Sequence, residues 1–449
     1  MLEANRTENI NTITYADIES VSGYVGNFEV TIRKRARFVT EKCNGCGACI
    51  DVCPAYRPHD FEYGMAQSKA IYSAFAQAVP GIVQIDKKYC MNCQLCKASC
   101  ELEAIDYDQQ DELITEKFGV IIVAVGYEEY APDGLLGFGV YPNVITQGRL
   151  ERILAPNGPT MGHLIRPSDG TRPKKIAMVQ CVGSRDGHSN AHCCSVGCLL
   201  AVKNAKLIKQ HYPDSEVSII YMDLRCTGKA SEEYSVATRK EGVKFIRSNI
   251  GRVKEGEDNS LILRFENTLN PGTLERLEAD LVVLTTNMVL SESGQKIAKL
   301  LRIERSPDGF LKEFHARLNP ISTKVPGIFL AGACQGPKSI ADSISHAKGA
   351  ASSAAKLLQD GKYEMELIRA VVESPENCSL CYRCVEACPY GAISISEDDK
   401  IQVDLVMCQG CGSCNNVCRS QTIQLRYYRD KAYEGMIDAL FSAPEPSNE

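Results

Sequence analysis

The spacing of the cysteines constrains this chain more than any other feature of its sequence. The 449 residues include 22 cysteines, and most of these repeat the spacing C-x2-C-x2-C-x3-C. The four copies are Cys43, Cys46, Cys49 and Cys53; Cys90, Cys93, Cys96 and Cys100; Cys378, Cys381, Cys384 and Cys388; and Cys408, Cys411, Cys414 and Cys418. Because the chain is large and its first residues lack the apolar core of a secretory signal, the pattern favours metal ligation in a reducing compartment over a disulfide framework.

This spacing is typical of ferredoxin modules that bind two [4Fe–4S] clusters. Three cysteines in a loop surround one face of a cluster, and the fourth begins a helix that reaches the other cluster of the pair. We therefore expect Cys53 to complete the second cluster and Cys100 the first, with Cys388 and Cys418 crossing in the same way at the C-terminus. Zinc is the poorer alternative, because zinc sites pair two CxxC units rather than triplets with a fourth cysteine.

The two motifs of the first pair are separated by a longer segment than those of the second pair. We predict a helix at 65–78 within this insertion, which would cap the clusters or form a contact rather than take part in chemistry. The segments "GAISIS" and "SQTIQL", which follow the C-terminal loops, are expected to be the short strands that close a ferredoxin module.

Between the modules, the sequence predicts an α/β fold with a parallel sheet. Apolar runs at 112–126, 174–183 and 277–286 indicate buried strands, and 195–211 indicates a helix. Residues 326–358 indicate a strand, a glycine turn and a long helix, whose positive N-terminus would face a phosphate or a flavin edge. A packing turn without a ligand is the alternative. No GxGxxG follows a strand, so a dinucleotide-binding domain would be completed by another chain or rearranged.

The bulk properties exclude several classes of protein. The net charge of −6 gives no support for nucleic-acid binding, and no apolar run is long enough for a membrane span. We therefore expect a cytoplasmic protein.

These segments together resemble the A subunit of heterodisulfide reductase (HdrA), a flavin- and iron–sulfur-containing family of methanogens and related archaea and bacteria. The matching stretches are "VSGYVGNFEVTIRKRARFV", "YPNVIT", "GHLIRPSDG", "CVGSRD…CCSVGC" and "GIFLAGACQGPKSI". The resemblance implies a thioredoxin-reductase-like FAD domain with one inserted and one appended ferredoxin module. The family's N-terminal domain and its FAD-binding glycine motif are absent, so we expect the C-terminal part of a split HdrA.

The resemblance also implies a division of the chain. The FAD-binding domain would comprise 1–38, 111–172 and 291–362; the ferredoxin modules would be 39–110 and 363–430; and a second dinucleotide-fold domain with an extra cluster would span 173–290, with a tail at 431–449.

The stretch "CVGSRDGHSNAHCCSVGC" matches no common metal motif by its spacing. The resemblance implies a fifth [4Fe–4S] cluster here, with Cys181, Cys193, Cys194 and Cys198 as ligands. A thiol pair or disulfide is the alternative, although adjacent cysteines are poorly placed to bridge one another. Cys226, where the family would have a small apolar residue, is expected to be a buried thiol, with a ligand role as the alternative.

The same resemblance places the turn 333–340 against the flavin ring. Expected FAD contacts are Gly126, Gly332, Ala333, Gln335, Gly336, Lys338 and Ser339. Lys338 would approach the redox face, where a cation stabilises an anionic reduced flavin, unless it is a solvated surface lysine. We expect Cys334 to be a packing residue, and His192 and His346 to be hydrogen-bonded structural residues rather than groups at the cluster or flavin edge.

The function implied is that of an oxidoreductase component in an electron-bifurcating complex, with no catalytic residue of its own. Electron pairs would arrive from a partner of the hydrogenase or formate dehydrogenase type and reach FAD, whose site is completed by a separate HdrA-like chain. One electron would go to ferredoxin and the other to the B and C subunits, which reduce the disulfide between coenzyme M and coenzyme B. The alternative is a flavin-free, polyferredoxin-like relay in a sulfur-metabolising or quinone-linked complex.

Overall fold

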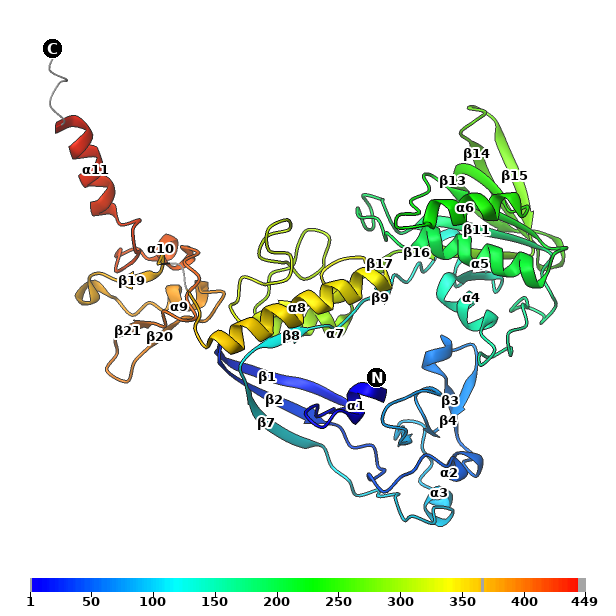
Figure 1. Cartoon of the computed structure of the whole chain (residues 1–449), viewed down its shortest axis with the longest axis horizontal. Helices are drawn as coiled ribbons and strands as arrows, with labels where there is room; N and C mark the ends of the chain where they lie inside the picture. Colours follow the sequence, from blue (N-terminus) through cyan, green and yellow to red (C-terminus); the bar gives the residue numbers. More distant parts are fainter. Residues whose placement is uncertain (1, 365–366, 443–449) are drawn as a thin grey trace.

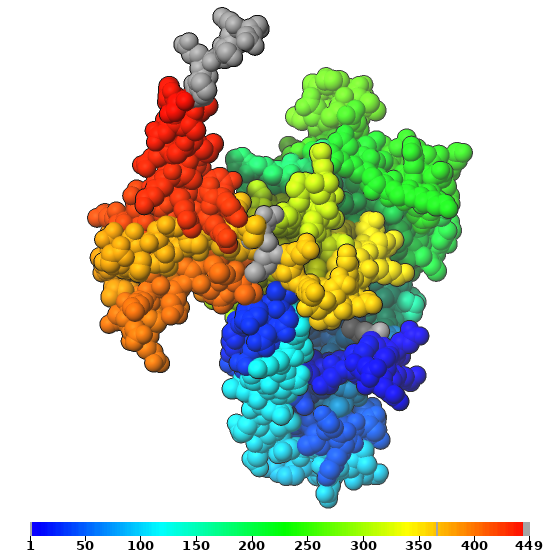
Figure 2. Space-filling view, turned by 60° about the vertical axis from the view of Figure 1, so that its left-hand side comes forward, coloured from blue at the N-terminus to red at the C-terminus, as the bar shows by residue number. Residues whose placement is uncertain are grey.

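The structure is a computed structural model that describes residues 2–364 and 367–442. Figure 1 shows a large sheet domain at one end, the C-terminal cysteine module at the other, and the inserted cysteine module below the sheet domain. Figure 2 shows the C-terminal module and its last helix as a separate lobe.

The sheet domain is built on seven strands in the order β10-β16-β11-β12-β13-β14-β15. Its first five strands are parallel, and β13, β14 and β15 are antiparallel. The strands are β10 (Val144–Thr146), β11 (Lys175–Val182), β12 (Glu216–Tyr221), β13 (Lys244–Glu255), β14 (Leu261–Asn267), β15 (Leu274–Ala279) and β16 (Leu281–Thr286). The helices of this domain are α4 (Gln147–Leu154), α5 (Gly197–His211) and α6 (Ser231–Lys240). Apolar residues of α4 and α5 pack with those of the strands in one core, as a parallel sheet requires.

A second region contains the expected flavin turn. An antiparallel sheet of β1 (Ala16–Tyr24), β2 (Asn27–Lys34) and β7 (Glu112–Phe118) lies beside a parallel pair, β8 (Ile121–Val123) and β18 (Ile328–Leu330). The turn η4 (Gly332–Cys334) leads from β18 to the long helix α8 (Ile340–Asp360). Two short strands, β9 (Glu128–Glu129) and β17 (Met288–Val289), pair where the chain passes between this region and the sheet domain. Helix α7 (Glu292–Leu300) follows β17.

The inserted module leaves the antiparallel sheet between two paired strands. Lys34 at the end of β2 lies opposite Glu112 at the start of β7, so the whole module is joined to the sheet at one point. The module contains α2 (Ala48–Asp51), β3 (Tyr56–Pro58), η1 (Asp60–Glu62), β4 (Gln67–Lys69), β5 (Ile71–Tyr72), β6 (Gln84–Ile85) and α3 (Leu95–Ala98).

The C-terminal module is a second small α/β unit, and short strands follow its cysteine loops as expected. Its elements are β19 (Ala370–Val372), η5 (Pro375–Asn377), α9 (Arg383–Ala387), β20 (Ile393–Ile395), β21 (Ile401–Val403), α10 (Ser413–Val417) and β22 (Ile423–Leu425). Helix α11 (Asp430–Ser442) projects from it. The remaining elements are α1 (Leu2–Arg6), η2 (Leu135–Gly137) and η3 (Glu257–Asn259).

The α/β fold with a parallel sheet and two ferredoxin-type modules is confirmed, but several element predictions were wrong. The segment 65–78 is not a helix, because residues 67–69 pair with 56–58 to form the β3–β4 hairpin. The run 112–126 is two strands rather than one buried strand, with the chain turning at Gly119 and β7 largely exposed. The run 277–286 includes the end of β15 and all of β16, because Asp280 turns the chain and accepts hydrogen bonds from the N–H groups of Lys174 and Lys175.

The expected boundary between 172 and 173 does not match the sheet. Strand β10 falls in the segment assigned to the FAD-binding domain, yet it pairs with β16 of the seven-stranded sheet. Helix α4 follows β10 directly and packs in the same core. We therefore propose that the second domain begins before residue 144.

Candidate metal centres and flavin site

The four cysteine loops have the same backbone conformation. In every loop, the second and fourth residues after the first cysteine have positive φ, between 50° and 86°: Gly45 and Gly47, Asn92 and Gln94, Leu380 and Tyr382, and Gly410 and Gly412. Such left-handed residues turn backbone N–H groups into the concave side of a loop, which makes an anion-binding nest. The N–H groups of Gly45 and Asn92 accordingly lie 3.4 Å from the sulfurs of Cys43 and Cys90. The loops therefore suit thiolates and a negatively charged cluster.

In the inserted module the fourth cysteine crosses to the other loop. Cys53 lines one small cavity together with Cys90, Cys93 and Cys96, which is the set expected for the second cluster. Burial raises the pKa of the Cys49 thiol to about 11, and the neighbouring thiols of Cys43, Cys96 and Cys46 contribute to this rise. Cys100 packs against the same small core as these cysteines.

The C-terminal module brings its cysteines together in the corresponding way. Burial raises the pKa of Cys384, and its neighbouring thiols include Cys418 and Cys378. Burial likewise raises the pKa of Cys414 to about 11, with Cys408, Cys388 and Cys411 as its neighbours. Each triplet thus lies beside the fourth cysteine of the other motif, as the crossing requires.

The irregular cysteines also converge. Cys181 lies on β11, while Cys193, Cys194 and Cys198 surround the start of α5. Burial raises the pKa of Cys194 to about 11, and the thiols of Cys193 and Cys181 contribute to this rise. Cys198, whose pKa burial raises to about 12, has Cys181, Cys194 and Cys226 as neighbours. All 22 cysteines are free thiols, so no disulfide occupies this site.

Arg185 provides a positive charge at the irregular site. It partly offsets the rise in the pKa of Cys181, which burial causes. Its Nη2 donates to Asp223 at 2.7 Å, whereas its Nη1 is buried and has no hydrogen-bond partner among the described residues. A buried donor without a partner is costly, so the site suits an additional acceptor beside Cys181.

The expected flavin turn has glycines with positive φ and an interacting set of polar side chains. Gly126 (φ 69°) and Gly332 (φ 73°) adopt backbone conformations that L side chains rarely adopt, and a Cβ on Gly126 would meet no atom within 4 Å. The N–H of Gly332 donates to Nδ1 of His346 at 3.0 Å. Free space above a left-handed glycine at the end of a strand suits the close approach of a flat ligand.

The polar side chains of the turn contact one another. Gln335 donates to Glu313 at 2.9 Å, and Lys338 contacts both Gln335 and the carbonyl of Gly336. Lys338 is partly buried, and burial lowers its pKa, so it is not a freely solvated lysine. The Ser339 hydroxyl caps α8 and donates to Asp342 at 2.7 Å. Ala333 packs against the core below the turn, and Gly336 lies close to Lys338.

The remaining candidates have structural contacts. Cys334 is fully buried, and its sulfur lies 3.2 Å and 3.3 Å from the carbonyls of Val123 and Ala331. His192 Nε2 bonds the Met288 carbonyl at 2.9 Å, and His346 Nε2 bonds that of Pro320 at 3.2 Å. Cys226 packs against the core of the sheet domain and is hydrogen-bonded to Ser235.

Sequence reasoning missed one group in the inserted module. The Tyr107 hydroxyl lies 3.0 Å from the sulfur of Cys96, where it can hydrogen-bond a cluster ligand. Tyr107 follows Cys100, the last cysteine of the motif, but no known cluster-binding sequence pattern includes a tyrosine at this position.

Two features are absent from the described residues, 2–364 and 367–442. No three or more His, Cys, Asp or Glu side chains are grouped so that they could hold a single metal ion. No helix in these ranges is both long and apolar enough to cross a membrane.

Comparisons with known families first define the class of protein. Residues 377–423 match the 4Fe-4S dicluster domain, and residues 36–56 match the 4Fe-4S binding domain. Both matches fall on the cysteine loops described above, so the chain contains iron–sulfur domains of the ferredoxin type.

Relatives that match nearly the whole chain define the family. The chain is 48% identical to the iron–sulfur A subunit of the CoB–CoM heterodisulfide reductase of Methanocaldococcus jannaschii, covering 99% of this chain and 68% of that protein. It is 46% identical to the A subunit of the H2/formate:CoB–CoM heterodisulfide,ferredoxin reductase of Methanococcus maripaludis, with the same coverage of 99% and 68%. The chain belongs to the HdrA family of heterodisulfide reductases, whose members are oxidoreductase subunits.

Two further similarities are more distant. The A subunit of the ferredoxin/F420H2-dependent CoB–CoM heterodisulfide reductase of Methanosarcina acetivorans is 41% identical over 88% of this chain and 50% of that protein. Among solved structures, the HOCl-induced flavoprotein disulfide reductase RclA of Escherichia coli matches with a TM-score of 0.34 and 13% identity. That match covers 59% of this chain and 52% of the other.

Proposed function

We propose that this chain is the iron–sulfur and flavin electron-transfer subunit of a heterodisulfide reductase complex that performs flavin-based electron bifurcation. The observation that carries this proposal is the convergence of Cys181, Cys193, Cys194 and Cys198 in a chain that also contains two ferredoxin-type cysteine modules and a glycine turn open to a flat ligand. A simple relay between two ferredoxin modules has no need of that turn.

Five [4Fe–4S] clusters would supply one-electron steps, and FAD would supply the step in which an electron pair is divided. The protein's residues hold and tune these groups. Buried cysteines provide thiolate ligands, while backbone N–H groups and the Tyr107 hydroxyl donate toward ligand sulfurs. Such hydrogen bonds stabilise the more negative, reduced state and so raise a reduction potential.

The FAD site would be completed by residues outside this chain. Within the described residues, β8 pairs only with β18, and Ile122 on β8 is 42% exposed. A short parallel strand with an open edge needs a neighbouring strand, because parallel sheets are stable when their edges and faces are covered. We propose that an HdrA-like chain with the FAD glycine motif adds this strand and the adenosine and pyrophosphate contacts. The turn from Gly332 to Ser339 would then face the flavin ring.

The partners follow from this role. A hydrogenase or formate dehydrogenase subunit would deliver electrons through one module, ferredoxin would accept one electron of each pair, and the B and C subunits would receive the other. The disulfide between coenzyme M and coenzyme B would be cleaved on those subunits, in the cytoplasm. The alternative function is a flavin-free relay in a related sulfur-metabolising or quinone-linked complex, which the open turn at Gly126 disfavours.

The test uses the complex purified anaerobically from its host with its partners bound. We expect one FAD per protomer and, on this chain after separation under iron-retaining conditions, about twenty irons. We also expect hydrogen or formate to reduce ferredoxin only while the heterodisulfide is present. Ferredoxin reduction at the same rate without heterodisulfide would contradict bifurcation. A complex without flavin would also contradict it and would favour the flavin-free relay.

A substitution of Arg185 tests the tuning of the irregular cluster. Because a positive charge beside Cys181 favours the reduced cluster, we expect Arg185→Gln to lower its reduction potential by about 50 mV, which for one electron is the free energy of roughly one ordinary hydrogen bond. The measurement is an EPR-monitored redox titration of the complex.

Arg185→Lys, which keeps the charge, is expected to restore most of that potential. Arg172→Gln, which breaks an exposed ion pair with Asp214 far from any cysteine loop, is the control and should leave all potentials unchanged. Equal potentials in the Arg185→Gln and unsubstituted complexes would contradict this role.

A further inference from the structure

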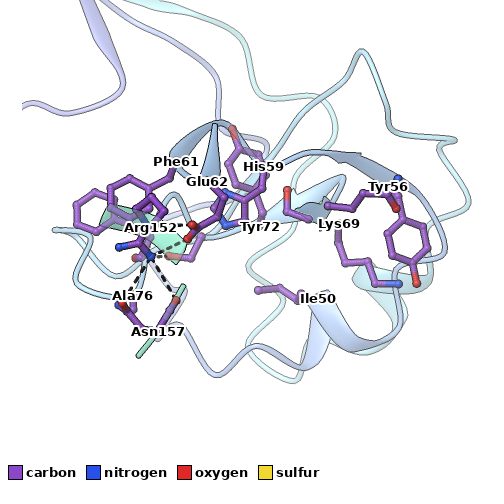
Figure 3. A pocket seen from close by; sticks show the side chains of 14 residues that line it. Ile50, Tyr56, His59, Phe61, Glu62, Lys69, Tyr72, Ala76, Arg152 and Asn157 are labelled. Atoms are coloured by element: carbon purple, nitrogen blue, oxygen red, sulfur yellow. Dashed lines mark hydrogen bonds and ion pairs between the residues drawn. The ribbon is translucent and has the colours of Figure 1, made fainter. Parts of the chain in front are cut away.

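A buried ion pair joins the inserted module to the sheet domain. Arg152 of α4 donates two hydrogen bonds to Glu62 of η1, from Nε to Oε2 at 2.9 Å and from Nη2 to Oε1 at 2.8 Å. The side chains of Arg152 and Glu62 are only 16% and 8% exposed. Figure 3 shows the two groups facing each other at the edge of a pocket. A bidentate pair of this kind has a narrowly defined geometry, and loss of one partner leaves a buried charge uncompensated.

Aromatic contacts on the module surround this pair. The Arg152 guanidinium lies over the ring of Phe61 at 4.7 Å, and Phe61 stacks on Phe75 at 5.1 Å. Met65 packs against the core of the sheet domain. The Tyr63 hydroxyl lies so close to α4 that a Cβ on Gly148 would be 2.3 Å from it. These contacts place residues 61–65, at the start of the segment that was expected to be a helix, against the sheet domain.

The ion pair is the hydrogen-bonded part of this contact. A cavity of about 420 Å³ adjoins it, with Arg152 and Asn157 on the side of the sheet domain and Ile50, Tyr56 and Lys69 on the side of the module. Loss of the ion pair would thus weaken the main polar contact between them.

Helix α4 is in turn connected to the irregular cysteine site. Gln147 at its start is buried, donates to Thr285 at 3.1 Å and accepts from Asn204 of α5 at 2.8 Å. Glu151 of α4 forms an ion pair with Lys203 of α5 at 2.6 Å. Because α5 begins with Gly197 and Cys198, a module held on α4 is held relative to the irregular site.

We propose that Glu62 and Arg152 form a clamp that fixes the inserted ferredoxin module at a set distance from the Cys181–Cys198 site, so that electrons pass between them. Both are positioning residues, and the inference rests on the proposed function of this chain. Electron-transfer rates fall steeply with the distance between redox groups, so a module that moves away from α4 would exchange electrons slowly.

The test uses the full complex with its clusters. We would compare three variants: Glu62→Gln, Arg152→Gln and the exchanged pair Glu62→Arg/Arg152→Glu. The first measurement is amide hydrogen exchange of residues 56–69. The second is the rate of electron transfer between the module and the fifth cluster, followed by freeze-quench EPR. We expect each single substitution to raise exchange at least about tenfold, equivalent to 1.4 kcal/mol of local opening, and to slow electron transfer. We expect the exchanged pair to restore much of the slow hydrogen exchange and of the fast electron transfer.

Lys175→Gln is the matched control, because it breaks an exposed ion pair with Glu278 in the same domain and should change neither quantity. Unchanged exchange in both single variants would overturn the clamp. Faster exchange with an unaltered rate of electron transfer would overturn its positioning role. About sixteen irons on the unsubstituted chain would instead contradict the fifth cluster, and with it the electron-transfer role, while the exchange data would still report on the contact.

Discussion

Cys194→Ser is expected to remove one complete cluster, about four of some twenty irons, while both ferredoxin modules keep theirs. Cys194 is 5% exposed and lies beside the thiols of Cys193, Cys181 and Cys198. A serine hydroxyl in this buried place cannot supply the thiolate that the cluster needs. Iron and acid-labile sulfide per chain measure the loss, and EPR of the reduced protein identifies the missing signal.

Cys226→Ser is the matched control for this experiment. Cys226 is a neighbour of Cys198 but is hydrogen-bonded to Ser235 and packs against the core, so we expect its replacement to leave the iron content unchanged. Loss of four irons in Cys226→Ser, or none in Cys194→Ser, would show that the ligand set is different. Loss of more than one cluster from Cys194→Ser would mean that the substitution unfolds the domain.

Gly126→Val is expected to abolish flavin binding and leave the iron content unchanged. Gly126 follows β8 with φ 69°, and a side chain here would project into space that holds no protein atom within 4 Å. The isoalloxazine or ribityl part of FAD would approach the backbone there, and two methyl groups would block it. The measurement is acid-extractable FAD per iron in the purified complex, together with the loss of heterodisulfide-dependent ferredoxin reduction.

The backbone strain of this substitution needs its own control. A β-branched residue at positive φ costs on the order of 1–3 kcal/mol wherever it is placed. Gly170→Val has nearly the same φ of 70° and also meets no atom within 4 Å, but it lies in a surface turn away from η4. We expect that variant to keep its FAD. Full flavin content in Gly126→Val would contradict the assigned site.

The sequence was most informative where chemistry requires a fixed spacing. Three cysteines in one loop and a fourth in the neighbouring motif are set by the geometry of a two-cluster module, and Cys53 and Cys418 lie beside the triplets to which they were assigned. The irregular site had no such template. Its four residues were identified only through the family resemblance, because they converge through the path of β11 and α5 rather than through local spacing.

The errors occurred where tertiary contacts decide local structure. Residues 65–78 contain enough alanine and apolar residues for a helix, but pairing with 56–58 and the packing of Met65 on another domain outweigh that preference. The ion pair of Glu62 and Arg152 joins residues 90 positions apart and leaves no pattern in the sequence. Asn92, Gln94, Leu380 and Tyr382 adopt positive φ where glycine would be the usual choice, so residue type alone could not locate these turns.

The pairing of Lys34 with Glu112 has a consequence for how such a protein can change over time. Since the inserted module leaves and rejoins the sheet at adjacent strand ends, a short hairpin turn could replace residues 35–111 without altering the register of β2 and β7. The whole cysteine module can thus be gained or lost as one unit, and the fold around the expected flavin turn need not be rebuilt. The number of cluster-binding modules in such a protein is then limited by the surfaces that can bind them, and α4 with Arg152 is one such surface.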